Sequence, residues 1–123
     1  MTAASLAQTA YAAAAPLRTP RGSEYAAFER ITARLSRAAA PDAPMPLRAA
    51  AVHDNRRLWT TLATDLAAAD DGLPQALRAQ LFYLAEFSLL QSRAALRDAE
   101  ALAALVDVNR AVMRGLAGEA AQA

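Results

Sequence analysis

The chain has 123 residues, of which 55% are hydrophobic and 20% charged, a composition that suits one domain with a substantial apolar core. The formal net charge is +1 and acidic residues are mixed with arginines, which argues against binding of nucleic acid through its phosphates. The absence of cysteine excludes disulfides, thiol catalysis and cysteine-ligated zinc, and it fits a reducing cytoplasm.

Neither a membrane span nor a secretory signal is expected. No stretch approaches the roughly 20 predominantly apolar residues that a helix needs to cross a bilayer. The alanine-rich segment 1–16 lacks the positively charged start and the strongly apolar centre of a secretory signal peptide. These observations indicate a cytoplasmic protein without a membrane segment.

Prolines divide the first half of the chain into helical segments. An alanine-rich helix is expected over about residues 4–14, and a second over about residues 20–39, with Thr19 as N-cap and Pro20 at the first helical position. The apolar stripe of the second helix comprises Tyr25, Phe28, Ile31 or Thr32, and Leu35. Beside it runs a basic ridge, which we interpret as a solvated face because no aromatic residue is interleaved with it: Arg30, Arg34 and Arg37.

Three further helices are expected in the second part of the chain. Three prolines between residues 41 and 46 predict a loop, after which helices follow over about residues 46–69 and 74–97. Asp98 is a suitable N-cap for a last helix over about residues 99–116, which Gly115 and Gly118 are expected to end.

No segment alternates with the period of a strand. We therefore predict an all-α, single-domain bundle of about five helices that spans residues 1–123. The ends, at about residues 1–3 and 117–123, are expected to fray.

The third and fifth helices each place an asparagine among apolar residues. On the third, one stripe comprises Ala51, Asn55, Leu58, Leu62 and Leu66. On the fifth, Asn109 lies in the stripe from Leu102 to Leu116. A buried amide without partners costs about 1–3 kcal/mol, so we expect both asparagines to be buried and hydrogen-bonded. Either each bonds to the backbone of a neighbouring helix and sets helix register, or one faces a groove that a partner fills.

Three arginines, Arg56, Arg57 and Arg110, flank the inward asparagines and are candidates for a binding role. Arg56 lies one turn before Trp59, where its stem can cover apolar surface and its guanidinium can stack on the indole. We interpret Trp59 first as core and alternatively as a binding anchor, since tryptophan is enriched at binding hot spots.

No catalytic or metal-binding constellation is recognisable, so we expect a protein that is not an enzyme and has no cofactor. His53 has no second histidine or cysteine to complete a metal site and belongs to the polar face of its helix. The four glycines form no phosphate-binding loop, and the carboxylates are scattered.

The fourth helix is the most apolar, with charged or small polar side chains in residues 81–90 only at Glu86 and Ser88. One of its faces carries Leu81 and Leu84, and another carries Tyr83, Phe87 and Leu90. A helix that is apolar nearly all round is either central in its domain or covered by a partner.

Five segments in order carry a family resemblance: AYAAAAP, TPRGSEYAAFERIT, NRRLWTTLATDLA, DGLPQALRAQLFYLAEFSLLQSRAAL and DVNRAVMRGL. Together they resemble the FlaF family of alphaproteobacterial flagellar biosynthesis regulators, over about residues 10–116. The NRRLW element, the GLP turn and the closing DVNRAVMRGL are the more specific parts. The loop at residues 38–45 and the C-terminal tail match no family pattern.

The resemblance implies a small cytoplasmic helical protein that is needed for flagellin production and acts opposite or together with a companion regulator, FlbT. It also implies binding of flagellin in the manner of a secretion chaperone. A surplus apolar helix suits this role, because a groove beside it can receive an amphipathic terminal helix of flagellin. We expect the binding surface at Tyr83, Phe87 and Leu90, with Arg56, Trp59 and Arg110 nearby.

Two alternatives remain open at this point. The fourth helix can instead form a structural homodimer, in which case its apolar face is a self-association surface. The second alternative is direct RNA binding by a translational regulator, although the near-neutral charge disfavours nucleic acid. A membrane partner is not expected.

Overall fold

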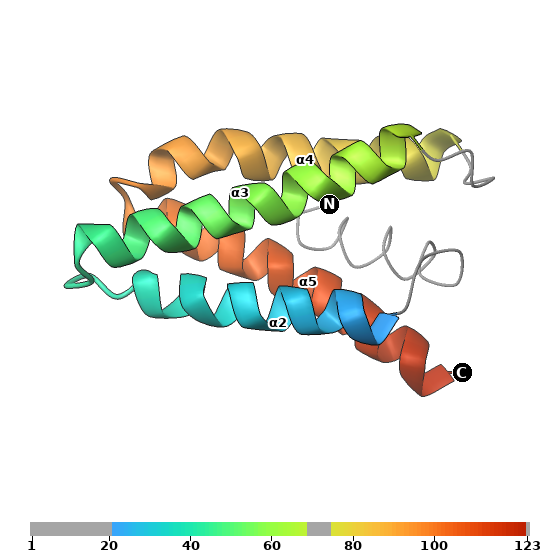
Figure 1. Cartoon of the computed structure of the whole chain (residues 1–123), viewed down its shortest axis with the longest axis horizontal. Helices are drawn as coiled ribbons and strands as arrows, with labels where there is room; N and C mark the ends of the chain where they lie inside the picture. The colour runs from blue at the N-terminus through green and yellow to red at the C-terminus, as the bar shows by residue number, and fades with distance from the viewer. Residues whose placement is uncertain (1–20, 69–74, 123) are drawn as a thin grey trace.

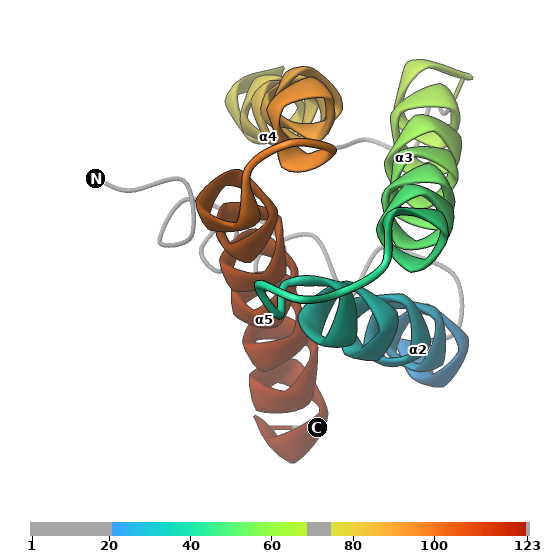
Figure 2. The same cartoon turned by 90° about the vertical axis from the view of Figure 1, so that its left-hand side faces the viewer.

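The computed structural model describes residues 21–68 and 75–122, which contain four α-helices. They are α2 (Arg21–Ala38), α3 (Met45–Ala68), α4 (Gln75–Ala95) and α5 (Ala99–Gln122). Successive helices run in opposite directions, and each packs against its neighbours in sequence (Figure 1). The view along the helices shows that α5 also packs against α2, which closes the four into a ring around one core (Figure 2).

The predicted all-α class is confirmed, and the described part of the chain contains helices and their connections but no strand. The bounds of α2, α3 and α4 lie within one or two residues of those expected from the prolines and the periodicity. The predicted helix over residues 4–14, the Thr19-Pro20 cap and the turn at residues 70–74 lie outside the described residues.

The last helix is longer than predicted, because α5 continues through Gly115 and Gly118 to Gln122. The expected end near Leu116 is therefore wrong, whereas the expected fraying of residues 117–123 stays a prediction. A glycine inside a helix costs only about 1 kcal/mol relative to alanine. Residues 117–122 other than Gly118 are alanine, glutamate and glutamine, which favour helix.

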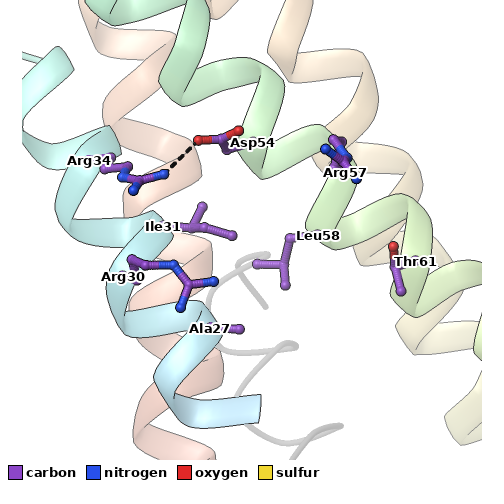
Figure 3. A pocket seen from close by; sticks show the side chains of 8 residues that line it. All are labelled: Ala27, Arg30, Ile31, Arg34, Asp54, Arg57, Leu58 and Thr61. Carbon is purple, nitrogen blue, oxygen red and sulfur yellow. Dashed lines mark hydrogen bonds and ion pairs between the residues drawn. The ribbon is translucent and has the colours of Figure 1, made fainter. Parts of the chain in front are cut away.

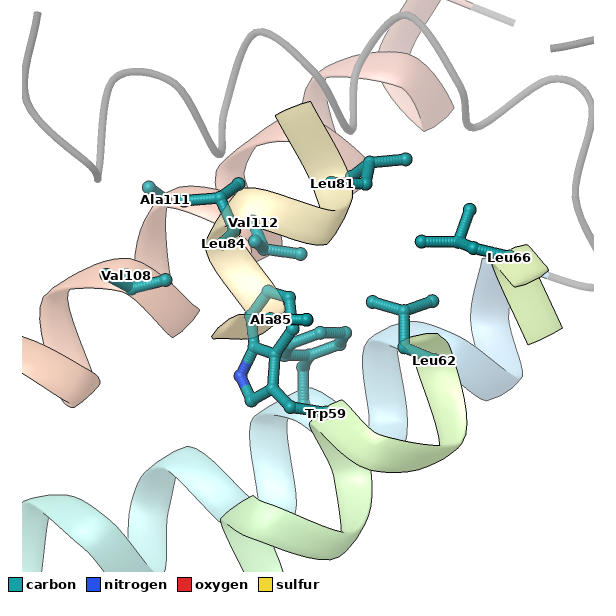
Figure 4. Packing of buried hydrophobic residues seen from close by; sticks show 10 residues of the cluster. Trp59, Leu62, Leu66, Leu81, Leu84, Ala85, Val108, Ala111 and Val112 are labelled. Atoms are coloured by element: carbon teal, nitrogen blue, oxygen red, sulfur yellow. The ribbon is translucent and has the colours of Figure 1, made fainter. Parts of the chain in front are cut away.

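The buried apolar residues form two clusters. The tryptophan cluster, shown in Figure 4, comprises Phe28, Trp59, Leu62, Leu66, Leu81, Leu84, Ala85, Val108, Ala111 and Val112. The second cluster lies nearer the α2–α3 and α4–α5 connections and comprises Ile31, Leu35, Ala38, Ala51, Val52, Ala95, Ala101, Leu102, Leu105 and Val106. In the first cluster the rings of Phe28 and Trp59 meet edge to face, with centroids 5.8 Å apart.

The stripes expected from the helical period are largely those that the structure buries. On α2 both Ile31 and Thr32 are buried, while the side chain of Tyr25 lies outside the described part. On α3 the stripe is buried except for the half-buried Leu58, and His53 lies on the exposed opposite face. None of the described helices combines the length and the hydrophobicity that crossing a bilayer requires.

The C-terminal ends of α2 and α3 each accept hydrogen bonds from an arginine of the next helix. Arg48 of α3 donates through Nε to the carbonyl of Ala38 and through Nη2 to that of Ala40, both at 3.4 Å. Arg78 of α4 donates through Nη1 to the carbonyl of Leu66, in the last turn of α3. The carbonyls of Ala38 and Leu66 lie in the last turns of α2 and α3, where the helix supplies no i+4 donor, and a cation at a helix C-terminus is favoured by the helix dipole.

The start of α5 is capped by Asp98, as the sequence predicted. Its carboxylate accepts a hydrogen bond from the backbone N–H of Glu100 at 2.9 Å, which satisfies a donor that the first turn leaves open. The cap is exposed, so its contribution to stability is separable from core packing.

We predict that Asp98→Ala lowers the free energy of unfolding by about 1 kcal/mol, because the N–H of Glu100 loses its acceptor. Urea unfolding followed by circular dichroism measures the change. Asp98→Asn keeps a capping oxygen and should lose less, and Asp107→Ala, at an exposed position within the same helix, is the matched control. If Asp98→Ala loses no more than Asp107→Ala, the cap does not stabilise α5.

Candidate functional site

Each of the four described helices contributes a buried polar side chain to one level of the bundle, which we call the polar layer: Thr32, Asn55, Ser88 and Asn109. Contacts between helices place these residues at one level: the Arg34–Asp54 ion pair and the Phe28–Trp59 ring contact for α2 and α3, the Arg56–Leu89 hydrogen bond for α3 and α4, and the Asn109–Asn55 hydrogen bond for α5 and α3. The polar layer therefore crosses the bundle between the two apolar clusters.

A directional chain of hydrogen bonds runs through this layer. The indole Nε1 of Trp59 donates to Oδ1 of Asn109 at 3.0 Å, and Nδ2 of Asn109 donates to Oδ1 of Asn55 at 2.8 Å. An indole nitrogen only donates, so the Asn109 amide must turn its oxygen to Trp59 and its nitrogen to Asn55. Both asparagine side chains are completely buried, at 0% exposure, as expected, but their partners are side chains and not the helix backbone of the first alternative.

The polar layer is only partly satisfied by hydrogen bonds. Ser92, one turn beyond the layer, donates to the Ser88 carbonyl at 2.7 Å. Three other buried polar atoms have no hydrogen-bond partner: Thr32 Oγ1, Asn55 Nδ2 and Ser88 Oγ. A partly satisfied buried network adds little net stability, and its best-attested use is to favour one arrangement of helices over others. The register-setting role of Asn55 and Asn109 stays a prediction.

The structure divides the predicted partner-binding residues between surface and core. Tyr83 and Leu90 are the large apolar side chains that α4 exposes, at 52% and 60%. Phe87 is half-buried and packs against the tryptophan cluster. Trp59 is fully buried, so its alternative interpretation as a surface anchor is wrong in this structure. Its bulk and its N–H donor are both used inside the bundle.

Arg56 lies on the exposed flank of α3, beside a groove between α3 and α4. Its Nη1 donates to the carbonyl of Leu89 at 3.2 Å, so the guanidinium bridges to α4 in place of the expected stacking on Trp59. The groove has a volume of about 320 Å³, and Leu90 lines it as well. Phe82 and Leu89 also line it, and neither is among the predicted binding residues, because their proximity to Arg56 depends on how α3 and α4 pair.

Arg110 lies elsewhere. Its Nη2 donates to Oγ of Ser36 at 3.4 Å, between α5 and α2, which is the side of the ring opposite the α3–α4 groove (Figure 2). The expectation that Arg110 lies near the α4 face is therefore wrong. Helix periodicity placed Arg110 on an exposed flank, but it does not reveal which neighbouring helix that flank faces.

Histidine and carboxylate side chains do not gather at one place. His53 is exposed on α3. Over residues 21–68 and 75–122, no three histidine, aspartate or glutamate side chains are grouped as a metal-binding site requires. The polar groups that the structure does bring together are those of the polar layer and the arginines on α2 and α3.

One comparison with known proteins yields a match. The family described as Flagellar protein FlaF matches residues 7–116, which includes the span over which the sequence motifs resemble that family. No curated protein and no solved structure matches the chain. The polar layer and the α3–α4 groove both lie within the matched residues.

We predict that Asn55→Leu and Asn109→Leu each destabilise the bundle, because each leaves a buried partner without its hydrogen bond, at about 1–3 kcal/mol per orphaned group. The double variant should lose less than the sum of the two, since it removes both partners of the Asn55–Asn109 bond. Urea unfolding of the four proteins of this cycle measures the coupling, expected at about 1 kcal/mol or more. Strict additivity would show that the bond between the two amides contributes nothing.

Proposed function

The chain belongs to the FlaF family of flagellar proteins, and on that basis we propose that it binds flagellin as a secretion-chaperone-like factor in flagellum biogenesis. In this proposal the protein works in the cytoplasm without enzymatic activity and promotes the synthesis or export of flagellin. A functional link to the companion regulator FlbT is part of the same proposal.

The exposed apolar face of α4 is the observation that supports binding of a helix. Tyr83 and Leu90 are both more than half exposed, and they are spaced i, i+7 on one side of the helix. Complete burial of a fully exposed large apolar side chain is worth about 1.5–3 kcal/mol, so a partner that covers the exposed part of both residues gains roughly half of that from each. The i, i+7 spacing fits the anchor pattern with which an amphipathic helix meets an apolar groove.

The groove between α3 and α4 extends this face. Leu90 belongs to both surfaces, and Phe82 and Leu89 continue the apolar lining. Arg56, Glu86 and Arg93 surround it with charge of both signs, as is common where a polar rim encloses an apolar centre. Because Arg56 is bonded to the Leu89 carbonyl, the two helices and the groove between them are held together before a partner arrives.

We predict that the protein co-elutes with monomeric flagellin of the same organism on a sizing column, and that Tyr83→Glu and Leu90→Glu abolish the complex. A buried carboxylate on this face opposes contact with an apolar stripe, and each change should weaken binding at least about tenfold. Phe87→Glu is unsuitable, because Phe87 packs against the core. Leu47→Glu is the matched control: Leu47 is 39% exposed near the start of α3 and does not line the groove.

Three further results decide the proposal. Flagellin without its terminal segments should not co-elute, because those segments carry the amphipathic helices. Unchanged thermal melting of Tyr83→Glu and Leu90→Glu would confirm that the loss concerns the surface. Absence of a complex at micromolar concentrations would overturn the proposal, and light scattering that shows a dimer sensitive to Leu90→Glu would favour self-association through α4.

A further inference from the structure

A second cleft lies between α2 and α3, with a volume of about 310 Å³ (Figure 3). Each helix lines it at positions i, i+3, i+4 and i+7, counted from Ala27 in α2 and from Asp54 in α3. Because these positions form one stripe on each helix, the cleft runs along both helices for about two turns, or roughly 10 Å. It is thus elongated, in the direction in which a third helix would lie.

The floor of this cleft is apolar. Ile31 and Leu58 point toward one another from α2 and α3, and the small side chain of Ala27 lies one turn before Ile31 (Figure 3). Leu58 is only half-buried although it belongs to the inward stripe of α3. An apolar side chain of a partner that entered here would bury the part of Leu58 that is now exposed.

The rim of the cleft carries an excess of positive charge. Arg34 donates from Nη1 to Oδ2 of Asp54 at 2.9 Å, so these two charges compensate each other. Arg30 and Arg57 also line the cleft, are exposed, and form no hydrogen bond or ion pair with any residue that the structure describes. Two guanidinium groups therefore remain available beside an apolar floor. Arg57 also lines a neighbouring depression with His53 and Arg56, which continues the basic surface along α3.

We propose that this cleft binds an acidic amphipathic helix of a partner protein, with its apolar stripe over Ile31 and Leu58 and its carboxylates at Arg30 and Arg57. Charge complementarity selects this occupant, because guanidinium groups form short, strong hydrogen bonds with carboxylates. The N-terminal segment of the chain, residues 1–20, contains no aspartate or glutamate and does not supply the complementary charge. The proposal does not depend on flagellin binding at α4.

Nucleic acid fits the cleft less well than an acidic helix. Single-stranded RNA is held by aromatic side chains on which bases stack, and no aromatic residue lines this cleft. Two unpaired arginines would also neutralise few phosphates, which limits the electrostatic contribution. The apolar floor has no role in phosphate binding, whereas it is the expected partner of an apolar helix stripe.

The test is a titration of the full-length protein into a fluorescein-labelled synthetic helix of about 20 residues, with leucines at i, i+4 and i+7 flanked by glutamates. Fluorescence anisotropy should show saturable binding that weakens as salt is raised. Arg30→Glu and Arg57→Glu should each weaken binding about tenfold, because each replaces attraction by repulsion. Arg37→Glu, at an exposed position on α2 outside the cleft, is the matched control and should bind like the unaltered protein.

Further arms of the experiment decide between occupants. A peptide in which glutamine replaces every glutamate should bind at least about tenfold more weakly, and a peptide with lysines should regain binding to the Arg57→Glu variant. Leu90→Glu should leave peptide binding unchanged, which separates this cleft from the α4 surface. Absence of saturable binding, equal binding of the glutamine peptide, or tighter binding of a labelled single-stranded RNA would overturn the proposal.

Discussion

The buried N–H of Trp59 is the constraint on which the interior of this bundle depends. A completely buried indole needs an acceptor, and the structure supplies one from α5, the helix farthest from Trp59 along the chain. Because Oδ1 of Asn109 accepts this hydrogen bond, Nδ2 of the same amide is left to donate, and it donates to Oδ1 of Asn55. The face of α5 that carries Asn109 is also the face that carries its buried apolar residues, and the two apolar clusters lie on either side of that level.

Much of this fold follows from residue pattern. Prolines near residues 41–46 and the 3.6-residue period predict where α2, α3 and α4 lie and which side of each is buried, and the cap at Asp98 predicts where α5 begins. The inward position of Asn55 and Asn109 follows from the same period, since it depends only on neighbours within one helix. The length of α5 does not follow, because the penalty of its two glycines is small enough for the surrounding helix formers to offset.

The sequence predicts which residues of the candidate site share a face of one helix, but not which residues of different helices lie together. The helical period predicts that Tyr83, Phe87 and Leu90 share one apolar face of α4, but it does not reveal that Tyr83 and Leu90 are exposed and Phe87 packs against the core. The separation of Arg110 from Arg56, and the bond from Arg56 to Leu89, depend on which helices are neighbours in the ring. The α2–α3 cleft was missed for the same reason: the arginines of α2 form a ridge on their own, and only the packing of α3 beside them supplies Asp54, Arg57 and an apolar floor.

The number of residues between the two partners of each contact suggests an order in which the helices assemble. Arg48 meets the end of α2 across only 8 or 10 residues, and Arg78 meets α3 across 12, so little chain entropy is lost when either hairpin closes. The bond between Asn55 and Asn109 spans 54 residues. We expect the hairpins to form early, and the docking of α5 to be the step at which a misaligned bundle is rejected, because only then does the indole N–H meet its acceptor. We therefore expect that correct pairing of the first three described helices is tested when α5 docks.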